Sequence, residues 1–120
     1  MSLLDALLLD PYRTNVWIAY RTDGVAGTGT QNDPYDGSTA TKLETLLNSF
    51  SVNTRVHLGP GMFQTNGYAD GVGGGWQPKA GMKIVGSGVE LATLQLAATS
   101  TNAHALQFHP GLFRNVRFDD

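Results

Sequence analysis

The residue types best suited to ligand binding gather in one glycine-rich stretch of the sequence. Tyr68, Asp70, Trp76 and Gln77 lie close together along the chain there. Flat aromatic faces pack against sugar rings, and neighbouring carboxylate and amide groups hydrogen-bond to hydroxyls. The four residues therefore form a predicted carbohydrate-binding site. The alternative interpretation, which the sequence favours, is a structural lid that uses the same aromatic side chains for packing.

A second group with chemical potential is the set of acidic residues Asp23, Asp33 and Asp36, which fall in one turn-rich loop. Carboxylate oxygens are ligands for hard cations such as calcium, but the spacing does not match the EF-hand pattern. Aspartate also stabilises turns through hydrogen bonds to the backbone. We therefore expect turn formation at these positions and predict neither a metal site nor a cofactor.

Candidate catalytic groups are scattered along the chain. Asp119 and Asp120 supply two carboxylates, as glycoside hydrolysis needs, but adjacent strand residues point to opposite faces of a sheet. His57, His104 and His109 have no acidic residue at a recognised metal-ligand spacing. We expect ordinary strand and turn roles for all of them, so the sequence predicts no catalytic residue.

Composition limits the classes of protein to which the chain can belong. Its 120 residues fit one domain, and a hydrophobic fraction of 41% allows a buried core. The net charge of -2, with scattered lysine and arginine, gives no footprint for nucleic acid. The chain has no cysteine, so the sequence predicts neither disulfides nor a thiolate metal site and does not identify a compartment.

The first stretch of the chain, residues 1–10, is apolar but lacks the basic residues of a signal peptide, and Asp5 and Asp10 interrupt it. It is also too short to span a membrane. The pattern predicts a short helix that Ser2 caps and Pro11 ends. Its leucines at positions 3, 4, 7 and 8 are too apolar for a solvated helix, so we expect them to cover a neighbouring element.

Two regular elements follow. Residues 15–20 are an apolar run rich in β-branched and aromatic side chains, which predicts a strand with Trp17 in the core. After a turn-rich loop, apolar residues recur at the spacing of one helical face. These residues are Leu43, Leu46, Leu47 and Phe50. Ser38 is the expected N-cap of this helix, and a capping box of Thr41 and Glu44 is the alternative.

After the predicted helix, apolar residues alternate with a period of two in short segments. Their inner-face pairs are Val56 and Leu58, Met82 and Ile84, Leu94 and Leu96, Leu106 and Phe108, and Val116 and Phe118. The segments centred on His57, Lys83 and Gln107 recur at a spacing of roughly 25 residues, which is typical of solenoids. Hairpin signals between adjacent segments are scarce. The sequence therefore predicts stacked coils around one apolar core.

Three motifs of this region occur in the order seen in a known family. The first is VHLGPGMF at residues 56–63, which follows a loop rich in glycine, threonine and aspartate and then the amphipathic helix. The second combines GMKIVGSG at residues 81–88 with TLQL at residues 93–96, and the third is LFRNVRFD at residues 112–119. Together they make residues 22–120, about four fifths of the chain, resemble the start of the pectate-lyase-like right-handed parallel β-helix superfamily.

The resemblance implies a mainly β fold: a right-handed parallel β-helix of about three coils with a capping helix. Residues 1–37 would hold the N-terminal helix, strand and loop, residues 38–50 the capping helix, and residues 51–120 the first coils of a single domain. At the coil corners we expect positive φ for the glycines and a left-handed bend at Asn115. The corner glycines are Gly61, Gly86 and Gly88.

The family comprises polysaccharide lyases, polygalacturonase-like hydrolases and phage tailspike proteins, and its enzymes place their catalytic residues on later coils. The resemblance therefore implies a non-catalytic N-terminal capping module linked to carbohydrate binding or processing. The alternatives are a polysaccharide lyase or glycoside hydrolase, and a structural or receptor-binding module of a phage tailspike or surface fibre. The expected partners are a polysaccharide and either further coils of a longer protein or a second copy of the chain. Nucleic acid and membrane are not expected partners.

Overall fold

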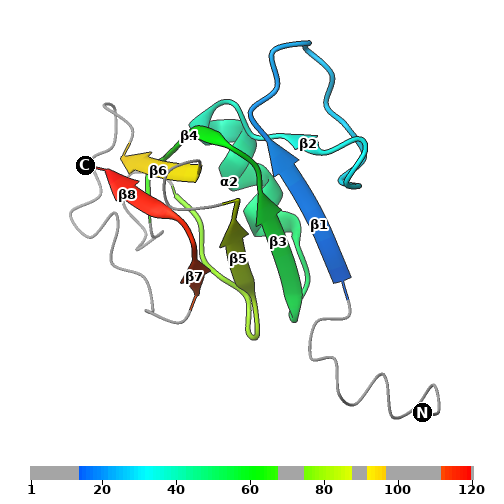
Figure 1. The fold of residues 1–120 in the computed structure, drawn as a ribbon. Coiled ribbons are helices and arrows are strands. Elements are labelled where there is room, and N and C mark those ends of the chain that lie inside the picture. The colour runs from blue at the N-terminus through cyan, green and yellow to red at the C-terminus, as the bar shows by residue number, and fades with distance from the viewer. Residues whose placement is uncertain (1–13, 68–74, 88–91, 97–111, 120) are drawn as a thin grey trace, which may run out of the picture.

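The computed structural model describes residues 14–67, 75–87, 92–96 and 112–119, and these form a mainly β structure with parallel sheets and one helix (Figure 1). The elements are β1 Thr14–Ala19, β2 Tyr35–Asp36, α2 Ala40–Ser49, β3 Thr54–Leu58, β4 Gly61–Thr65, β5 Lys83–Gly86, β6 Ala92–Leu96, β7 Phe113–Arg114 and β8 Arg117–Asp119. The predicted N-terminal helix, Tyr68, Asp70, the segment at residues 106–108 and the histidines His104 and His109 lie outside the described residues.

The strands are divided between two parallel sheets. Sheet A has the order β2-β1-β3-β5-β7 and sheet B the order β4-β6-β8. From β3 onward, consecutive strands alternate between the sheets, so that β3, β5 and β7 belong to sheet A while β4, β6 and β8 belong to sheet B. Each strand therefore pairs in parallel with the strand two elements later, and not with its neighbour in the sequence.

One column of apolar residues runs across sheet A. The parallel register aligns Val16 with Val56, Val56 with Ile84, and Ile84 with Phe113. Val56 and Ile84 are buried, whereas Val16 and Phe113 at the two ends of the column are partly buried. Since residues in register share a face of a parallel sheet, this column is the inner face that the alternating pattern predicted.

The matching column of sheet B aligns Phe63 with Leu94 and Leu94 with Phe118. Phe63 and Leu94 are 0% and 2% exposed, but Phe118, on the last strand of the column, is 42% exposed. The predicted inner-face position is therefore confirmed for Leu94, and Phe63, which the alternation did not include, shares this face. Phe118 is in register with the inner-face residue Leu94, but its side chain is not buried.

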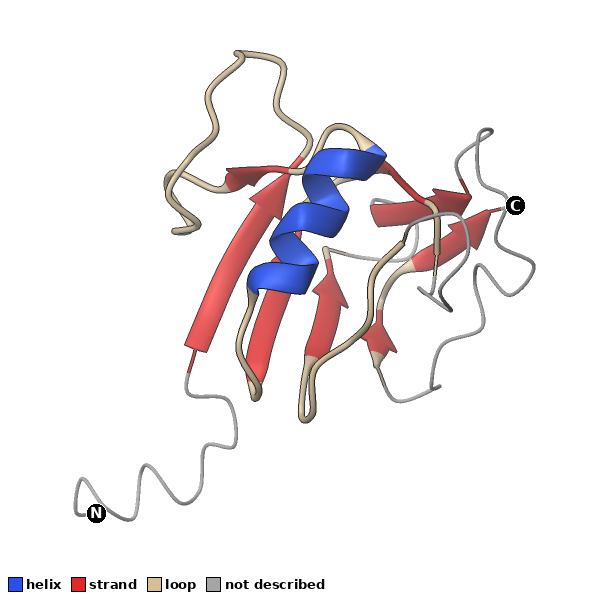
Figure 2. Ribbon diagram, turned by 180° about the vertical axis from the view of Figure 1, so that it is seen from behind, coloured by secondary structure: helices blue, strands red, loops and turns tan. Residues whose placement is uncertain are grey.

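Helix α2 lies across one face of sheet A, as Figure 2 shows from behind. Leu43 and Leu47 are buried in the same cluster as Val56 and Leu58, so the predicted apolar face of the helix is confirmed. The N-cap differs from the prediction, because the Thr39 side chain accepts the hydrogen bond from the Lys42 backbone. Neither predicted cap, Ser38 or the Thr41 and Glu44 pair, occupies this position, and Ser38 instead donates its backbone N–H to the Asp36 carboxylate at 2.9 Å.

Of the predicted corner residues that the structure describes, two have the expected backbone conformation and one does not. Gly61 and Asn115 have φ values of 135° and 58°, as expected. Gly86 does not have positive φ; a Cβ atom there would lie 2.2 Å from the carbonyl oxygen of Asn115. Glycine at this position is therefore required by the close approach of the Asn115 backbone and not by a left-handed turn.

Candidate functional site

Two of the four predicted carbohydrate-binding residues are described. Trp76 is 0% exposed and lies in the hydrophobic core, with its ring edge-to-face against Phe113 at a centroid distance of 6.3 Å. Gln77 is exposed, and its backbone N–H donates to the Asn48 side chain at 3.1 Å. The Trp76 ring therefore offers no open face to a sugar, which agrees with the packing role that the sequence favoured for this residue and not with the binding role.

The acidic loop is held together by Arg21. The guanidinium donates two hydrogen bonds to Asp23, at 3.0 and 2.7 Å, and one to Asp33 at 2.7 Å. The same group donates to the carbonyl of Pro34 at 2.7 Å. Hydrogen bonding to Arg21 brings the pKa of Asp23 down to about 2 and also lowers the pKa of Asp33. These two carboxylates are therefore committed to an ion-pair network that closes the loop.

The third carboxylate of the predicted group, Asp36, lies apart from this network. Its side chain is buried and accepts hydrogen bonds from the Lys42 ammonium and from the Ser38 backbone N–H, both at 2.9 Å. Burial opposes ionisation of Asp36, but the hydrogen bonds from Lys42 and Ser38 outweigh it and lower the pKa to about 2. In the part of the chain that the structure describes, no three His, Cys, Asp or Glu side chains converge on a point where a metal ion would bind.

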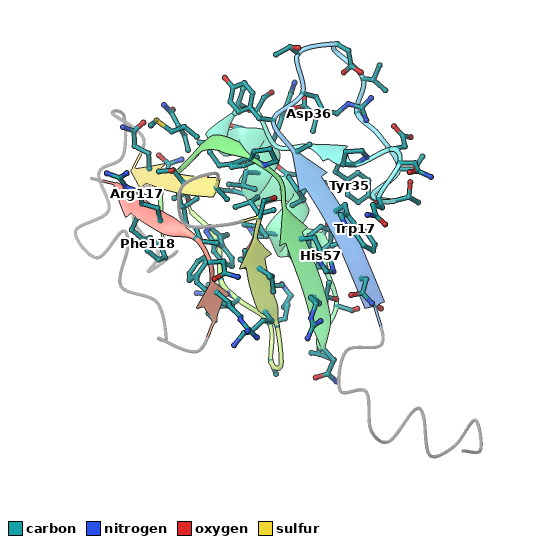
Figure 3. The ribbon with its side chains drawn as sticks, in the orientation of Figure 1. Trp17, Tyr35, Asp36, His57, Arg117 and Phe118 are labelled. Carbon is teal, nitrogen blue, oxygen red and sulfur yellow. The ribbon has the colours of Figure 1, made fainter. Side chains whose placement is uncertain are left out.

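The outer face of sheet A carries an aromatic pair that the sequence analysis did not assign. Trp17 and His57 are register partners on β1 and β3, and their rings stack with centroids 4.4 Å apart and planes 9° apart (Figure 3). Trp17 is partly buried and lies on the face opposite Val16 and Ile18. The prediction of Trp17 as a core residue is therefore wrong, whereas His57 faces outward, as the predicted inner-face pair of Val56 and Leu58 implies.

The polar atoms around His57 fix its orientation and affect its charge. Its Nε2 lies 3.0 Å from the Asn15 amide oxygen, an acceptor, so this contact fits the Nε2–H tautomer. Burial lowers the pKa of His57 below its usual value of 6.5, and the positive charge of Arg55 lowers it further. The imidazole is therefore neutral at physiological pH and stacks on the indole as an uncharged ring.

Trp17 and His57 line an open groove of about 370 Å³ at the carboxyl ends of β1, β3 and β5. Gln31 and Pro34 border it on the side of the acidic loop, and Ser87 borders it beyond β5. The Ser87 hydroxyl donates to the carbonyl of Leu58 at 3.2 Å and keeps its acceptor lone pairs. The groove thus combines two stacked rings with a neutral amide and a hydroxyl, which suits an uncharged ligand that has both apolar faces and hydroxyl groups.

Trp17 was missed because every residue of the run from Val16 to Ala19 is apolar, so no alternation indicates which face is buried. The position of Trp17 in the strand does indicate its face. Successive strand residues point to opposite faces of a sheet, so Trp17 faces away from Ile18, and it pairs with the histidine that separates the two apolar residues of β3.

Comparison with protein-family models, with curated proteins and with solved structures finds no match to this chain. In the described residues there is no helix that is long and apolar enough to cross a membrane.

Proposed function

We propose that this chain is the N-terminal capping module of a right-handed parallel β-helix, with no catalytic centre of its own, and that it presents a carbohydrate-binding groove. The observation that carries the proposal is the alternation of consecutive strands between two parallel sheets, with apolar columns in register across both. A chain that returns to the same sheet after each pair of strands stacks one coil on the previous one.

The position of α2 supports a capping role. Sheet B begins at β4, and α2 packs beside this strand. The Glu44 carboxylate of α2 is buried and accepts three hydrogen bonds from the end of β4: from the Thr65 hydroxyl at 2.7 Å, the Asn66 backbone N–H at 2.6 Å and the Asn66 amide at 2.9 Å. The helix thereby covers the first edge of sheet B, which would otherwise be open to pairing with another strand.

The opposite end of the stack supports a role as the start of a longer assembly. Phe118 has the register of the buried Phe63 and Leu94 but is 42% exposed, and its ring lies edge-to-face against Phe113 at 4.8 Å. Another coil stacked on β7 and β8 would bury these rings. That coil comes from a longer version of the chain or from a second copy.

The Trp17 and His57 groove supports the carbohydrate part of the proposal. Stacked rings bind the apolar faces of sugars, while Gln31 and Ser87 are placed to hydrogen-bond to hydroxyls at the two sides of the groove. The predicted set of Tyr68, Asp70, Trp76 and Gln77 contributes less, because the Trp76 ring is buried. We therefore place the binding surface on sheet A.

A binding assay against a panel of neutral and acidic polysaccharides tests this assignment. We expect weak but saturable binding by calorimetry or NMR, at least tenfold weaker for Trp17→Ala. Tyr20→Ala is the matched control, because Tyr20 is an exposed aromatic residue (47%) that does not line the groove, and it should bind as the original protein does. Equal binding by Trp17→Ala and the original protein, or no binding to any glycan, would refute the carbohydrate proposal.

The same panel addresses the enzyme alternative, a polysaccharide lyase or glycoside hydrolase. If the protein cleaves a polysaccharide of the panel, and the cleavage is lost in Asp119→Asn or Asp120→Asn, the chain is an enzyme and the non-catalytic proposal is wrong.

A further inference from the structure

The groove beside Trp17 and His57 can change its charge through one side chain. Among the described residues that line the groove, His57 is the only titratable one. The other lining residues are apolar or carry a neutral polar group, such as the Gln31 amide and the Ser87 hydroxyl. Histidine gains its proton in mild acid, so a fall in pH converts this uncharged groove into a cationic one.

The position of the His57 ring is fixed by two neighbours on β1. One face of the ring stacks on Trp17, and Nε2 lies 3.0 Å from the Asn15 amide oxygen (Figure 3). Because Nε2 already carries the hydrogen of this contact, an incoming proton goes to Nδ1. Asn15 is the only hydrogen-bond partner of the ring in the described part of the chain, so the second N–H of an imidazolium depends on water.

The charged side chains that share the outer face of sheet A with His57 are basic. Arg55 lies two residues before His57 on the same face of β3, and Lys83 of β5 is the register partner of Arg55. Arg114 lies one strand further on, in β7. Strands β1, β3, β5 and β7 contain no aspartate or glutamate. An imidazolium in the groove therefore has no carboxylate from these four strands to offset its charge.

The carboxylates of the acidic loop and of β2 are engaged by other cations. Asp23 and Asp33 accept hydrogen bonds from Arg21, and Asp36 accepts one from Lys42 at 2.9 Å. The pKa values of Asp23 and Asp36 are about 2, and the pKa of Asp33 is also lowered. These carboxylates therefore stay ionised in mild acid, and the loop keeps its ion pairs while the imidazole gains a proton.

We propose, on the basis of the carbohydrate groove proposed above, that the groove binds neutral saccharides and that protonation of His57 releases them. A sugar that packs over the ring pair displaces water from the imidazole. The neutral ring loses little by this change. An imidazolium loses hydration that uncharged sugar hydroxyls replace only in part, and it gains no carboxylate in return.

The sign of the pH dependence follows from linkage between ligand and proton. Since the sugar binds the neutral ring better, the pKa of His57 is lower in the complex than in the free protein. The affinity is therefore full above the pKa of the free protein and is lost as the pH falls below it. If only the neutral form binds, the dissociation constant rises about tenfold for each pH unit below that pKa.

Calorimetry tests the release with the neutral glycan of the panel that binds most tightly at about pH 7.5, followed down to about pH 4.5. The original protein should lose affinity as linkage requires. His57→Phe keeps an aromatic ring beside Trp17, and His57→Gln keeps an amide that can donate to Asn15. Neither side chain is charged, so the affinity of both variants should be independent of pH. Far-UV circular dichroism checks that each protein is folded at each pH.

NMR titration of the His57 ring gives a second readout that needs no variant to bind. The titration midpoint in the original protein should be lower with the same glycan at saturation than without it. An unchanged midpoint would overturn the proposal, and so would an affinity that does not vary with pH or that falls equally in both His57 variants.

The outcomes also separate this proposal from the proposed function. Binding that is lost in Trp17→Ala but does not vary with pH would leave the carbohydrate groove standing and overturn the release by His57. Binding that becomes tighter in acid would mean that the groove holds an anionic sugar, which overturns the neutral ligand class. If no glycan binds at about pH 7.5, both proposals are wrong.

Discussion

Trp17 and His57 stack as register partners on the outer face of sheet A, with ring centroids 4.4 Å apart. The pair depends on parallel pairing of β1 with β3, because only this register places the indole directly beside the imidazole. The pKa of His57 reports on the packing of this ring pair, because it depends on the partial burial of the imidazole and on the nearby positive charge of Arg55.

The pH dependence of stability should follow His57. Its pKa in the folded state is lowered below 6.5, so the unfolded chain binds the proton more readily. The contribution of the neutral imidazole is therefore fully present above pH 6.5 and is lost as the pH falls through the folded-state pKa. NMR titration of the His57 ring should give a midpoint below 6.5, and a midpoint above 6.5 would contradict the packing described for the pair.

Urea unfolding of His57→Gln supplies the control for this titration. The variant should lose the part of the acid-dependent destabilisation that arises from His57 and keep the part that arises from other groups. If its stability falls with acid as steeply as that of the original protein, His57 is not responsible.

Removal of the Glu44 carboxylate should destabilise the junction of α2 and β4. Glu44→Ala leaves the Thr65 hydroxyl and two Asn66 donors without this buried acceptor, and the expected loss is about 2–4 kcal/mol of unfolding free energy. Urea unfolding measures the loss. Thr45→Ala is the neighbouring control on the same helix at an exposed position, and it should change the unfolding free energy by at most about 0.5 kcal/mol.

The close approach of Gly86 to the backbone of Asn115 predicts a large cost for a small substitution. In Gly86→Ala, the new Cβ would lie 2.2 Å from the backbone carbonyl of Asn115, and overpacking of this kind costs about 1–3 kcal/mol. Gly59→Ala is the matched control, because its nearest contact is an ordinary 3.4 Å. Similar unfolding free energies for the two variants would show that Gly86 does not lie against the backbone of Asn115.

The hydrogen-bond network that closes the acidic loop depends on the planar geometry of the Arg21 guanidinium. Arg21→Lys keeps the positive charge but cannot donate to Asp23, Asp33 and Pro34 together as the planar group does. Limited proteolysis should therefore cleave the loop between Arg21 and Pro34 several times faster in the variant. Val25→Ala serves as a substitution within the loop that leaves the Arg21 hydrogen bonds intact, because the Val25 residue is 48% exposed and only its backbone N–H bonds to Asp23. Equal cleavage of Arg21→Lys and the original protein would contradict the role of Arg21.

Alternation of apolar residues was enough to predict the inner faces of β3 and β5. Arg55 and His57 separate the buried residues of β3, and Lys83 separates the buried Met82 from Ile84 of β5. Alternation failed for Trp17, whose neighbours are all apolar. It made no prediction for Trp76, which is buried by contact with Phe113, far away in the sequence. The N-cap was misplaced by one residue because Ser38 and Thr39 are both good capping residues.

The ion-pair network was also beyond sequence reasoning. The acidic residues of the loop were recognised, but their common partner Arg21 is identified only when the loop closes on itself. The candidate groove was missed for the same reason, because it is assembled from the ends of three strands that are separated in the sequence.

Through-space NMR contacts test whether successive coils share one apolar interior. We expect cross-peaks between the side chains of Phe63 and Leu94 and between those of Leu94 and Phe118, because these residues are in parallel register on one face. Strong Hα–Hα contacts between neighbouring strands, the mark of antiparallel hairpins, together with the absence of those side-chain cross-peaks, would contradict a shared interior.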